Sequence, residues 1–478
     1  MTTDGVGDRG GVHQPISTNR IGGPRNTMAG SPMGSSARGA MAHPVSPRPL
    51  TVSRTSFGSV SRDSNGRLRE VHDDKRGIDV QHRLNGSSKV SAVRADHSRI
   101  VAERGRAGYI ARPYSFHGHP YYSRTYAWHG HIYQRMYRGY TFRRIPVEVY
   151  APRVYYAPAF YGWAYYPWAT PVPYAWGWGP DPWYGYYGFY FTPYPSYAAP
   201  ADWLTDYVIS QDLAAAYAAQ QAQAQQAQQT QQTDASVAQP TGQPAITPEI
   251  KAEIAAQIKD EIQLENAEAQ ANAQGQEPDP QSSSINRMFL DGQSHIFIAD
   301  DSLDVTDAQG NGCPLSDGDV LQLAPPQDPE ATAGVLTVLA SKGGTECQQG
   351  TTVSVGLSDL QEMQNGMRAT LDQGMQELSQ AKGIPTPPMD SSATAPSAID
   401  ATAPKPDADV DAQLRQELTE GDQADRAAAA APAQPNPTSM LLSPFGGLSG
   451  SAMFVQDAEP AELLAAARRD PLYDRRRW

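Results

Sequence analysis

Tyr114-Ser-Phe-His-Gly-His-Pro-Tyr121 and Tyr126-Ala-Trp-His-Gly-His-Ile-Tyr133 are two copies of one short repeat, spaced twelve residues apart. Each copy places a His-Gly dipeptide between aromatic runs, as successive β-hairpins do. Upstream, Asn65-Gly66 and Asn85-Gly86 separate short alternating runs, and Asn-Gly supplies the positive φ angles of a two-residue hairpin turn. Residues 53–153 therefore predict a twisted antiparallel β-hairpin ribbon, polar on one face and aromatic on the other.

A tract rich in aromatic residues, glycine and proline follows at residues 154–201. Of the 24 tyrosines, 22 lie between Tyr109 and Tyr207, together with seven of the eight tryptophans. Proline and glycine at irregular intervals argue against a regular helix or a central strand. We expect either a compact, irregular clasp packed on the ribbon or an exposed, adhesive tract.

Residues 202–270 predict a helical spacer with two helices and an Ala/Gln tract between them. The first helix begins near Asp202. The second is capped by Thr247, carries Pro248 in its first turn, and has a stripe of isoleucines at positions 250, 254, 258 and 262. We interpret the stripe as a docking face rather than a self-association seam, because so few heptads make a weak seam.

After a linker at 271–285, residues 286–382 predict a small β domain followed by an amphipathic helix. Strand-like runs occur at 295–298, 303–305, 320–323, 335–339 and 352–355. Short strands with close turns indicate an SH3-like β-barrel or a sandwich. Ser358 is the expected N-cap of the helix, with Gln361 completing a capping box. The apolar stripe of that helix is Leu360, Met363, Met367, Leu371, Met375 and Leu378.

The predicted fold class is therefore α+β, modular and partly disordered. Residues 1–52 are rich in Gly, Pro, Ser and Arg, and residues 383–478 form an acidic tail rich in Pro and Ala. We expect both ends to be disordered, apart from a short helix near Ala461–Arg468.

Charge divides the chain into a basic and an acidic part. Residues 1–153 carry 24 Lys and Arg against 10 Asp and Glu, whereas the remainder carries 14 against 41. This asymmetry favours attraction between the two parts, or between copies, and gives the basic part affinity for polyanions. Charged surface that keeps weakly folded segments soluble is the plainer interpretation.

The two cysteines, Cys313 and Cys347, both fall within the predicted β domain. Such a pair predicts a structural disulfide and an oxidising, extracytoplasmic compartment: the periplasm, the cell surface or the medium. Two buried free thiols are the alternative. No signal peptide is visible at Met1, so export requires a start upstream. No apolar run reaches 18 residues, and we expect no membrane-spanning segment.

Several sets of residues are candidates for ligand contact. Basic and aromatic residues interleave late in the ribbon, which suits an anionic envelope polymer or polysaccharide better than nucleic acid, and suits plain cross-strand pairing best. The candidate anion contacts are Arg124, Arg135, Arg138, Arg143 and Arg144. Exposed tryptophans would stack on sugar rings, and the candidates are Trp163, Trp168, Trp176, Trp178 and Trp183.

A metal site is only weakly indicated. His117 and His119, and likewise His129 and His131, form His-x-His pairs that would have to converge, but the glycine inside each pair places both in turns. The aspartates at positions 300, 301, 304 and 307 lack the glutamate of an EF-hand. We find no nucleophile elbow and no phosphate-binding glycine loop, and expect no cofactor.

Two blocks of the chain resemble a family of exported, Tyr/Trp/Gly-rich bacterial proteins found mainly in acidobacteria. The first block includes Tyr155-Tyr-Ala-Pro-Ala-Phe-Tyr-Gly-Trp-Ala-Tyr-Tyr-Pro-Trp168 and Trp203-Leu-Thr-Asp-Tyr207. The second includes Leu315-Ser-Asp-Gly-Asp-Val-Leu321 and Asp359-Leu-Gln-Glu-Met363. The resemblance implies export and assigns no functional residue. Separately, Arg62-Asp-Ser-Asn-Gly-Arg-Leu-Arg-Glu-Val71 is similar to one unit of a YD/RHS-type repeat, which implies a β-meander.

These features predict a non-enzymatic structural or interaction protein of the cell envelope, which contacts anionic polymers through its basic, aromatic part. A carbohydrate-binding module using exposed Trp and Tyr is the alternative. An enzyme ranks third, and its mark would be a pocket that gathers ionisable groups from separate segments. We expect no such pocket. The sequence does not indicate the oligomeric state.

Overall fold

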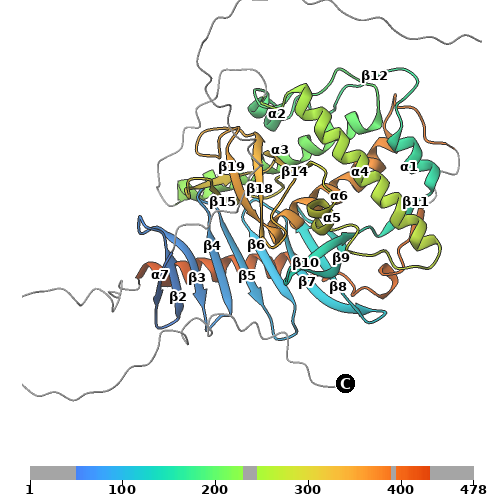
Figure 1. Ribbon diagram of the computed structural model, residues 1–478. Coiled ribbons are helices and arrows are strands. Elements are labelled where there is room, and N and C mark those ends of the chain that lie inside the picture. Colours follow the sequence, from blue (N-terminus) through green and yellow to red (C-terminus); the bar gives the residue numbers. More distant parts are fainter. Residues whose placement is uncertain (1–49, 230–244, 389–393, 431–478) are drawn as a thin grey trace, which may run out of the picture.

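The computed structural model describes residues 50–229, 245–388 and 394–430. Its N-terminal part is a ten-stranded antiparallel sheet in which every strand pairs with its neighbours in sequence (Figure 1). This meander confirms the predicted hairpins. The strands are β1 (Thr51–Arg54), β2 (Gly58–Arg62), β3 (Leu68–Asp73), β4 (Ile78–His82), β5 (Ser88–Val93), β6 (Arg99–Glu103), β7 (Gly108–Phe116), β8 (His119–Trp128), β9 (His131–Phe142) and β10 (Ile145–Ala151).

The long hairpins at the end of the sheet have two-residue turns. His117 and Gly118 have φ angles of 48° and 82°, and His129 and Gly130 have φ angles of 48° and 79°. Two successive positive φ angles define the type I′ turn, whose twist matches that of the flanking strands. Histidine therefore occupies the position that asparagine takes in the commonest turns of this type.

The two faces of the sheet differ from the predicted polar and aromatic faces. One face is aliphatic: Ile78, Val80 and Val90, with Ile100 and Ile110 further along, pack under a helix. The other face carries tyrosine and arginine together, because these residues alternate with the small and aliphatic ones along β6 to β9. This face thus carries aromatic and charged residues side by side, whereas Arg112, Tyr121 and Arg138 lie on the opposite face.

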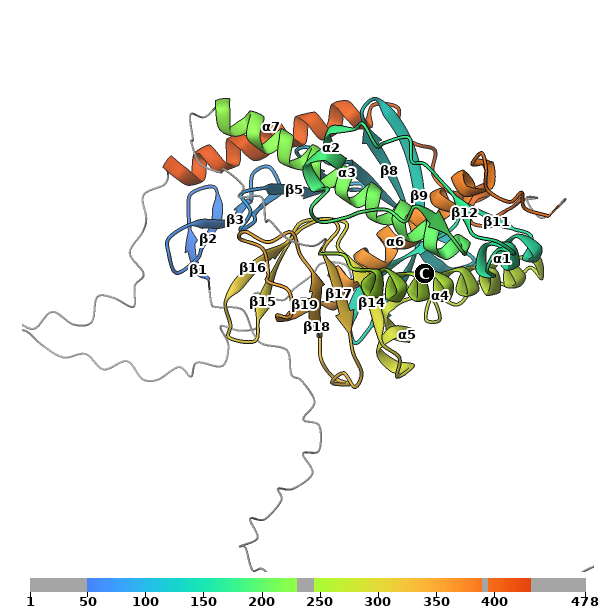
Figure 2. The ribbon, with the colours of Figure 1, turned by 90° about the horizontal axis from the view of Figure 1, so that it is seen from above.

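The covering helix is α7 (Val410–Ala430), which lies across β3 to β8 (Figures 1 and 2). This corrects the expectation that residues 383–478 are disordered apart from a short helix near Ala461–Arg468. Leu414 packs on Ile100 and Ile110, and Ala424 and Ala428 pack over the shorter strands. Small residues on this helix face permit a close approach to the sheet. The helix expected near Ala461 lies outside the described residues.

The aromatic tract is a compact clasp, but it packs mainly on helices rather than on the sheet. It contains the short helices α1 (Pro158–Tyr165) and α2 (Pro182–Tyr187) and the strands β11 (Val154–Tyr156), β12 (Val172–Pro173) and β13 (Ser196–Tyr197). The expectation of no helix is therefore wrong. Proline is tolerated because Pro158 and Pro182 occupy the first turns of their helices, where no backbone N–H is needed. β11 pairs with β20 (Thr394–Pro396), and a 3₁₀ turn follows at Asp400–Thr402.

Two long helices support the clasp. They are α3 (Pro200–Gln229) and α4 (Pro248–Ala273). The side chain of Thr247 accepts a hydrogen bond from the backbone N–H of Ile250, as the sequence predicts. The isoleucine stripe of α4 is buried in one core with the clasp, α3 and part of α6. The stripe is thus a docking face.

The second large sheet has six strands in the order β14-β17-β18-β19-β15-β16 and is open, not a closed barrel. The expected SH3-like barrel is thus not what forms. After the helix α5 (Ile285–Leu290), the strands are β14 (His295–Ile298), β15 (Leu303–Asp307), β16 (Gly312–Leu315), β17 (Val320–Leu323), β18 (Ala333–Ala340) and β19 (Thr352–Gly356). Figure 2 shows this sheet and α7 on opposite sides of the ten-stranded sheet.

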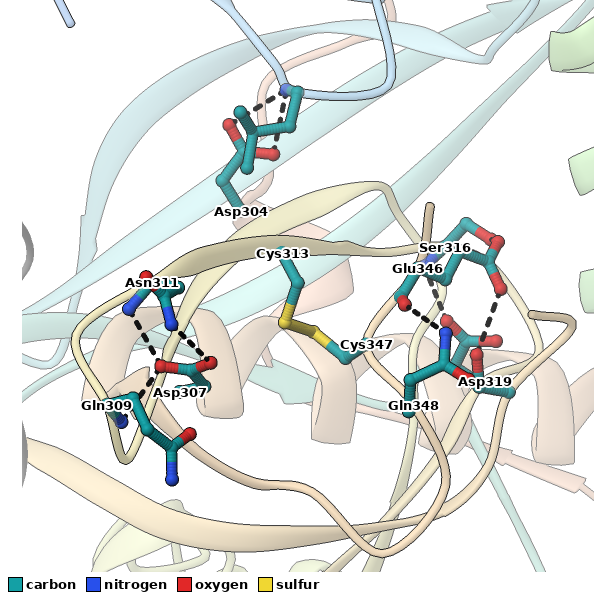
Figure 3. Close-up of a disulfide and its surroundings, with 12 residues drawn as sticks. Asp304, Asp307, Gln309, Asn311, Cys313, Ser316, Asp319, Glu346, Cys347 and Gln348 are labelled. Carbon is teal, nitrogen blue, oxygen red and sulfur yellow. Dashed lines mark hydrogen bonds between the residues drawn. A yellow bond between two sulfur atoms is a disulfide. The ribbon is translucent and has the colours of Figure 1, made fainter. Parts of the chain in front are cut away.

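Cys313 and Cys347 form a disulfide that joins β16 to the loop between β18 and β19 (Figure 3). The loop is also held by Glu346, whose carboxylate accepts hydrogen bonds from the Ser316 and Ser341 hydroxyls. The backbone N–H of Ser316 in turn donates to Asp319 at 2.8 Å. The predicted pairing is therefore present, within a loop that polar contacts also hold in place.

Helix α6 (Leu357–Gln380) carries the predicted stripe, and all six of its apolar residues are buried. Its N-cap is Gly356 rather than Ser358, and no side chain caps it. Gln361 does not complete a capping box, because its side-chain oxygen accepts from the backbone N–H of Ile285. Asn365 binds the edge strand β10, accepting from the N–H of Tyr150 and donating to the carbonyl of Glu148. This amide fixes α6 over the edge of the ten-stranded sheet.

The described part of the chain is thus mixed α+β, as predicted, with seven α-helices and two large antiparallel sheets. None of these helices is long and apolar enough to span a membrane.

Candidate binding cleft

A cleft of about 1210 Å³ lies between the tyrosine- and arginine-bearing face of the ten-stranded sheet and helices α3 and α6. Its floor is formed by β4 to β10, and its walls include residues 211–218 of α3, residues 358–376 of α6 and the loop at Asp300 and Asp301. It gathers ionisable groups from several separate segments. The expectation that no such pocket exists is therefore wrong.

One tyrosine ladder crosses the floor of the cleft, and a second ladder lies beside it and contributes Tyr150 to the floor. Tyr109, Tyr126 and Tyr133 are direct cross-strand partners on β7, β8 and β9. The ring centroids of Tyr126 and Tyr133 are 5.0 Å apart with planes only 4° from parallel. Tyr137 and its partners on β8 and β10 form the second ladder, and the Tyr126 and Tyr137 hydroxyls lie 2.9 Å apart. The floor is therefore an aromatic surface to which Tyr109, Tyr126, Tyr133 and Tyr150 contribute.

Arg124 and Arg135 lie directly opposite each other between the two ladders. Like charges opposite each other destabilise a sheet unless something compensates them. Arg124 is compensated: it is 2% exposed and its guanidinium lies 2.6 Å from both Glu148 and Glu362. A buried arginine of this kind is held in place by its carboxylates and is not free to bind a ligand.

Arg135 has a different environment. Its guanidinium carbon lies 5.3 Å from the ring centroid of Tyr126 and 5.4 Å from that of Tyr133. No hydrogen bond or ion pair links Arg135 to any carboxylate in the described residues, and its nearest neighbours include the neutral rings of Tyr126 and Tyr133. Tyr133 itself is 36% exposed. This end of the cleft thus offers an uncompensated guanidinium beside an accessible aromatic ring.

The opposite end of the cleft is acidic, and its carboxylates are of two kinds. Asp301 lies 2.9 Å from Arg83, 3.2 Å from Lys89 and 3.4 Å from Arg106. Burial opposes its ionisation, but these three cations together hold the pKa of Asp301 below its usual value. Asp359 has no such partner, and burial raises its pKa to about 6. The cleft therefore contains one carboxylate, Asp301, that is paired with cations of this chain, and another, Asp359, that is not.

The contacts around Asp301 belong to a network that joins the basic and the acidic parts of the chain. Arg106 also pairs with Asp317, and Arg69 pairs with Asp304. On the far face of the sheet, Asp407, which precedes α7, lies 2.9 Å from Arg112. Asp425 of α7 lies 2.9 Å from His82. The attraction expected from the charge asymmetry is thus seen within one chain, on both faces of the sheet.

The other arginines predicted to contact an anion lie outside the cleft. Arg138 is 2% exposed and paired with Glu268, and it donates a hydrogen bond to the Tyr155 hydroxyl. Arg143 donates to the backbone carbonyls of Asp328 and Ala331. Arg144 is exposed, in the turn between β9 and β10. The structure therefore places only Arg124 and Arg135 of that set at the cleft, and internal carboxylates occupy Arg124.

The tryptophans predicted to stack on sugars lie within the clasp. Trp183 is buried, and Trp163 and Trp168 are half-buried against the core. Trp176 and Trp178 line a second pocket of about 330 Å³ together with Trp203, Tyr207 and Glu377. The rings of Trp178, Trp176, Trp203 and Tyr207 form a continuous stack with centroid spacings of 5.3, 4.6 and 5.4 Å. The inner rings thus cover one another's faces.

The two His-x-His pairs do not converge. His117 and His119 lie at one end of the ten-residue strand β8, and His129 and His131 lie at the other end. A strand of this length spans roughly 30 Å. Within the described ranges, no three His, Cys, Asp or Glu side chains are grouped so as to hold a metal ion.

Sequence reasoning missed the acidic wall of the cleft. Asp212 on α3, and Asp359, Glu362 and Asp372 on α6, were not singled out because charges on amphipathic helices are usually solvated. A signal for the floor was present in Tyr122-Ser-Arg-Thr-Tyr126 and Tyr133-Gln-Arg-Met-Tyr137. In a strand, alternate residues share a face, so this spacing places tyrosine and arginine side by side.

Comparisons with protein-family models, with curated proteins and with solved structures found no match to this chain.

Proposed function

We propose that this protein is a non-enzymatic, extracytoplasmic binding protein of the cell envelope that holds an acidic saccharide in the cleft. The observation that carries the proposal is Arg135. It is a guanidinium in the cleft without a carboxylate partner among the described residues, next to the accessible ring of Tyr133.

The chemistry of this pair suits an acidic sugar. A guanidinium presents a planar fork of N–H donors that matches a carboxylate, and charge-assisted bonds of this kind are among the stronger ones in proteins. A tyrosine ring offers an apolar face to a sugar and a hydroxyl to its polar rim. Pockets for organic ligands typically combine such surfaces with a few well-placed polar groups.

The ion pairs of the remaining arginines argue against a polymer that wraps around the whole basic part of the chain. Arg83 and Arg106 bind acidic residues of this chain, as Arg124 does. An external polyanion would have to displace them, at a cost of several kcal/mol for each buried pair. The ligand is therefore expected inside the cleft rather than along the sheet.

The Cys313–Cys347 disulfide supports an oxidising compartment. Alkylation of unreduced protein from fractionated cells tests this part. Two protected cysteines in the envelope or secreted fraction agree with it, and two alkylated cysteines in the cytosol contradict it.

Calorimetric titration with a hyaluronan tetrasaccharide, which alternates uronic acid and N-acetylhexosamine, tests the ligand class. A chitin tetrasaccharide of the same length but without charge is the control ligand. Arg135→Gln should weaken hyaluronan binding by about tenfold or more, the loss of one charge-assisted bond. Arg144→Gln, an exposed arginine outside the cleft, should leave binding unchanged. Equal affinity for both saccharides, or a progressive cleavage of the bound one, overturns the proposal.

The aromatic pocket favours a second candidate, a carbohydrate-binding site for neutral sugars. Trp178 is half-buried between Trp176 and the rings of Trp183 and Tyr184, and it lines a pocket that also includes Glu377 and exposed glutamine side chains. Titration of tryptophan fluorescence with the chitin tetrasaccharide tests it, with Trp178→Ala as the variant. A flat response in the unaltered protein rules this candidate out.

A further inference from the structure

Asp212 is a buried acid without a partner. It lies on α3 and lines the cleft, and its exposed fraction is 8%. No hydrogen bond or ion pair joins its carboxylate to another residue of the described segments. Aspartate is almost never buried to this degree unless it is paired, because an isolated charge loses its hydration. The absence of a partner for the Asp212 carboxylate in the described residues therefore calls for an explanation.

Asp300 lines the same cleft, and no hydrogen bond or ion pair joins its carboxylate to another residue in the described part of the chain. This residue follows β14, and its side chain is seated against the backbone of α6 at Gly366, where a Cβ atom would lie 1.8 Å from the Asp300 carboxylate oxygen. Glycine at this position of α6 thus makes room for the carboxylate. The neighbouring Asp301, by contrast, is surrounded by three cations.

The charges that face this pair leave it uncompensated. Around Asp212 lie the carboxylates of Asp300 and Asp317 and the cations of Arg106 and Lys342. Both cations are committed elsewhere, Arg106 to Asp317 and Lys342 to Asp319. Burial first, and then these carboxylates, raise the pKa of Asp212 above its usual range. Burial followed by the charge of Asp301 raises the pKa of Asp300 to about 7.

We propose that Asp212 and Asp300 form a subsite for a primary ammonium group, so that the ligand of the cleft is an acidic saccharide that also carries a free amino sugar. The inference rests on the proposed function and adds a positively charged group to the acidic saccharide. An organic cation fits better than a metal ion, because the described residues offer no group of three or more metal-ligating side chains here. An ammonium donates three hydrogen bonds, which matches two carboxylates.

The two subsites lie at different places along the cleft. Asp212 is near Arg106, in the turn between β6 and β7, whereas Arg135 is on β9. Three strand spacings separate β6 from β9, which is about 14 Å. A ligand that engages both must carry its amino group and its carboxylate on separate sugar units rather than on one.

The experiment compares the hyaluronan tetrasaccharide with the same tetrasaccharide after N-deacetylation, which replaces each acetamido group by a free amine and leaves the carboxylates unchanged. Calorimetric titration is carried out on the full chain at pH 7. The amine-bearing form should bind about tenfold more tightly, the gain expected from a charge-assisted hydrogen bond. Binding should also release protons, so that the observed heat depends on the ionisation enthalpy of the buffer.

Asp212→Asn should remove this preference, so that the variant binds the amine-bearing and the acetylated tetrasaccharide equally well. Asp181→Asn, an exposed carboxylate outside the cleft, should keep the preference. Asp300→Asn is a second variant for the same subsite in case Asp212→Asn fails to fold. Equal binding of both tetrasaccharides by the unaltered protein, or an undiminished preference in both cleft variants, overturns this inference and leaves the proposed function standing. Failure to bind either tetrasaccharide overturns both.

Discussion

Leu414→Ala is predicted to destabilise the whole protein, because α7 is an integral cover of the ten-stranded sheet. Leu414 is 6% exposed and packs against Ile100 and Ile110 on β6 and β7. A Cβ atom placed on Gly108 would lie 2.9 and 3.0 Å from its two methyl carbons, so the leucine fills its site closely. Large-to-small substitutions at such sites cost about 2–5 kcal/mol, and more where the surroundings cannot collapse. Hydrogen-bonded strands collapse poorly into a cavity, and we expect about 3–4 kcal/mol.

Urea unfolding followed by far-ultraviolet circular dichroism measures this loss as a lower midpoint with an unchanged slope. Leu290→Ala is the matched control, since it makes the same chemical change at a side chain that is 62% exposed. Surface changes of this kind stay within about 0.5 kcal/mol. If Leu414→Ala unfolds at the same urea concentration as Leu290→Ala, α7 does not hold the sheet and the docking described above is incorrect.

Three further predictions follow from local features. Cys347→Ser should lower the free energy of unfolding by about 3–4 kcal/mol in the loop-entropy treatment, because the disulfide closes a loop with a sequence separation of 34; urea unfolding measures it, and an unchanged midpoint contradicts it. The raised pKa of Asp300, about 7, means that the folded state binds this proton more tightly than the unfolded state does. Its contribution to stability is therefore complete below about pH 4 and is lost as the pH rises through 7, so Asp300→Asn should flatten the pH profile of the unfolding midpoint between these values, whereas parallel profiles contradict it. His129→Asn should preserve stability and His129→Val should cost about 1–2 kcal/mol, because the φ of residue 129 is 48°; equal melting temperatures contradict this assignment of the turn.

Local signals were sufficient for most of the individual elements. The Asn-Gly and His-Gly turns, the cap at Thr247 and the isoleucine stripe each depend on residues close in sequence. The strands of the second sheet were located to within a few residues because each is a short apolar run between turn residues. β16 was missed because Gly312-Cys-Pro-Leu315 contains too few β-forming residues to be distinguished from a loop.

Long-range packing was not predictable from those signals. α7 is rich in Ala, Asp and Gln, and such a composition also describes a disordered tail. What makes it a folded helix is the sheet beneath it, since the helix face of Gly421, Ala424 and Ala428 gains stability only by approaching a flat surface. A Cβ atom on Gly421 would lie 2.6 Å from Val90, and neither residue predicts the other.

The cleft shows the same division between what is local and what is not. The tyrosines and arginines of its floor follow from the alternation along β8 and β9, but which arginine is free does not. Arg124 and Arg135 have the same neighbours in sequence, a tyrosine two residues away on either side. The placement of β10 and α6, which brings Glu148 and Glu362 to Arg124 and not to Arg135, separates a structural ion pair from a candidate ligand contact. The charge asymmetry of the sequence therefore predicts that the two parts attract each other. The proposed function depends on the few charged residues, such as Arg135, that form no ion pair within the described part of the chain.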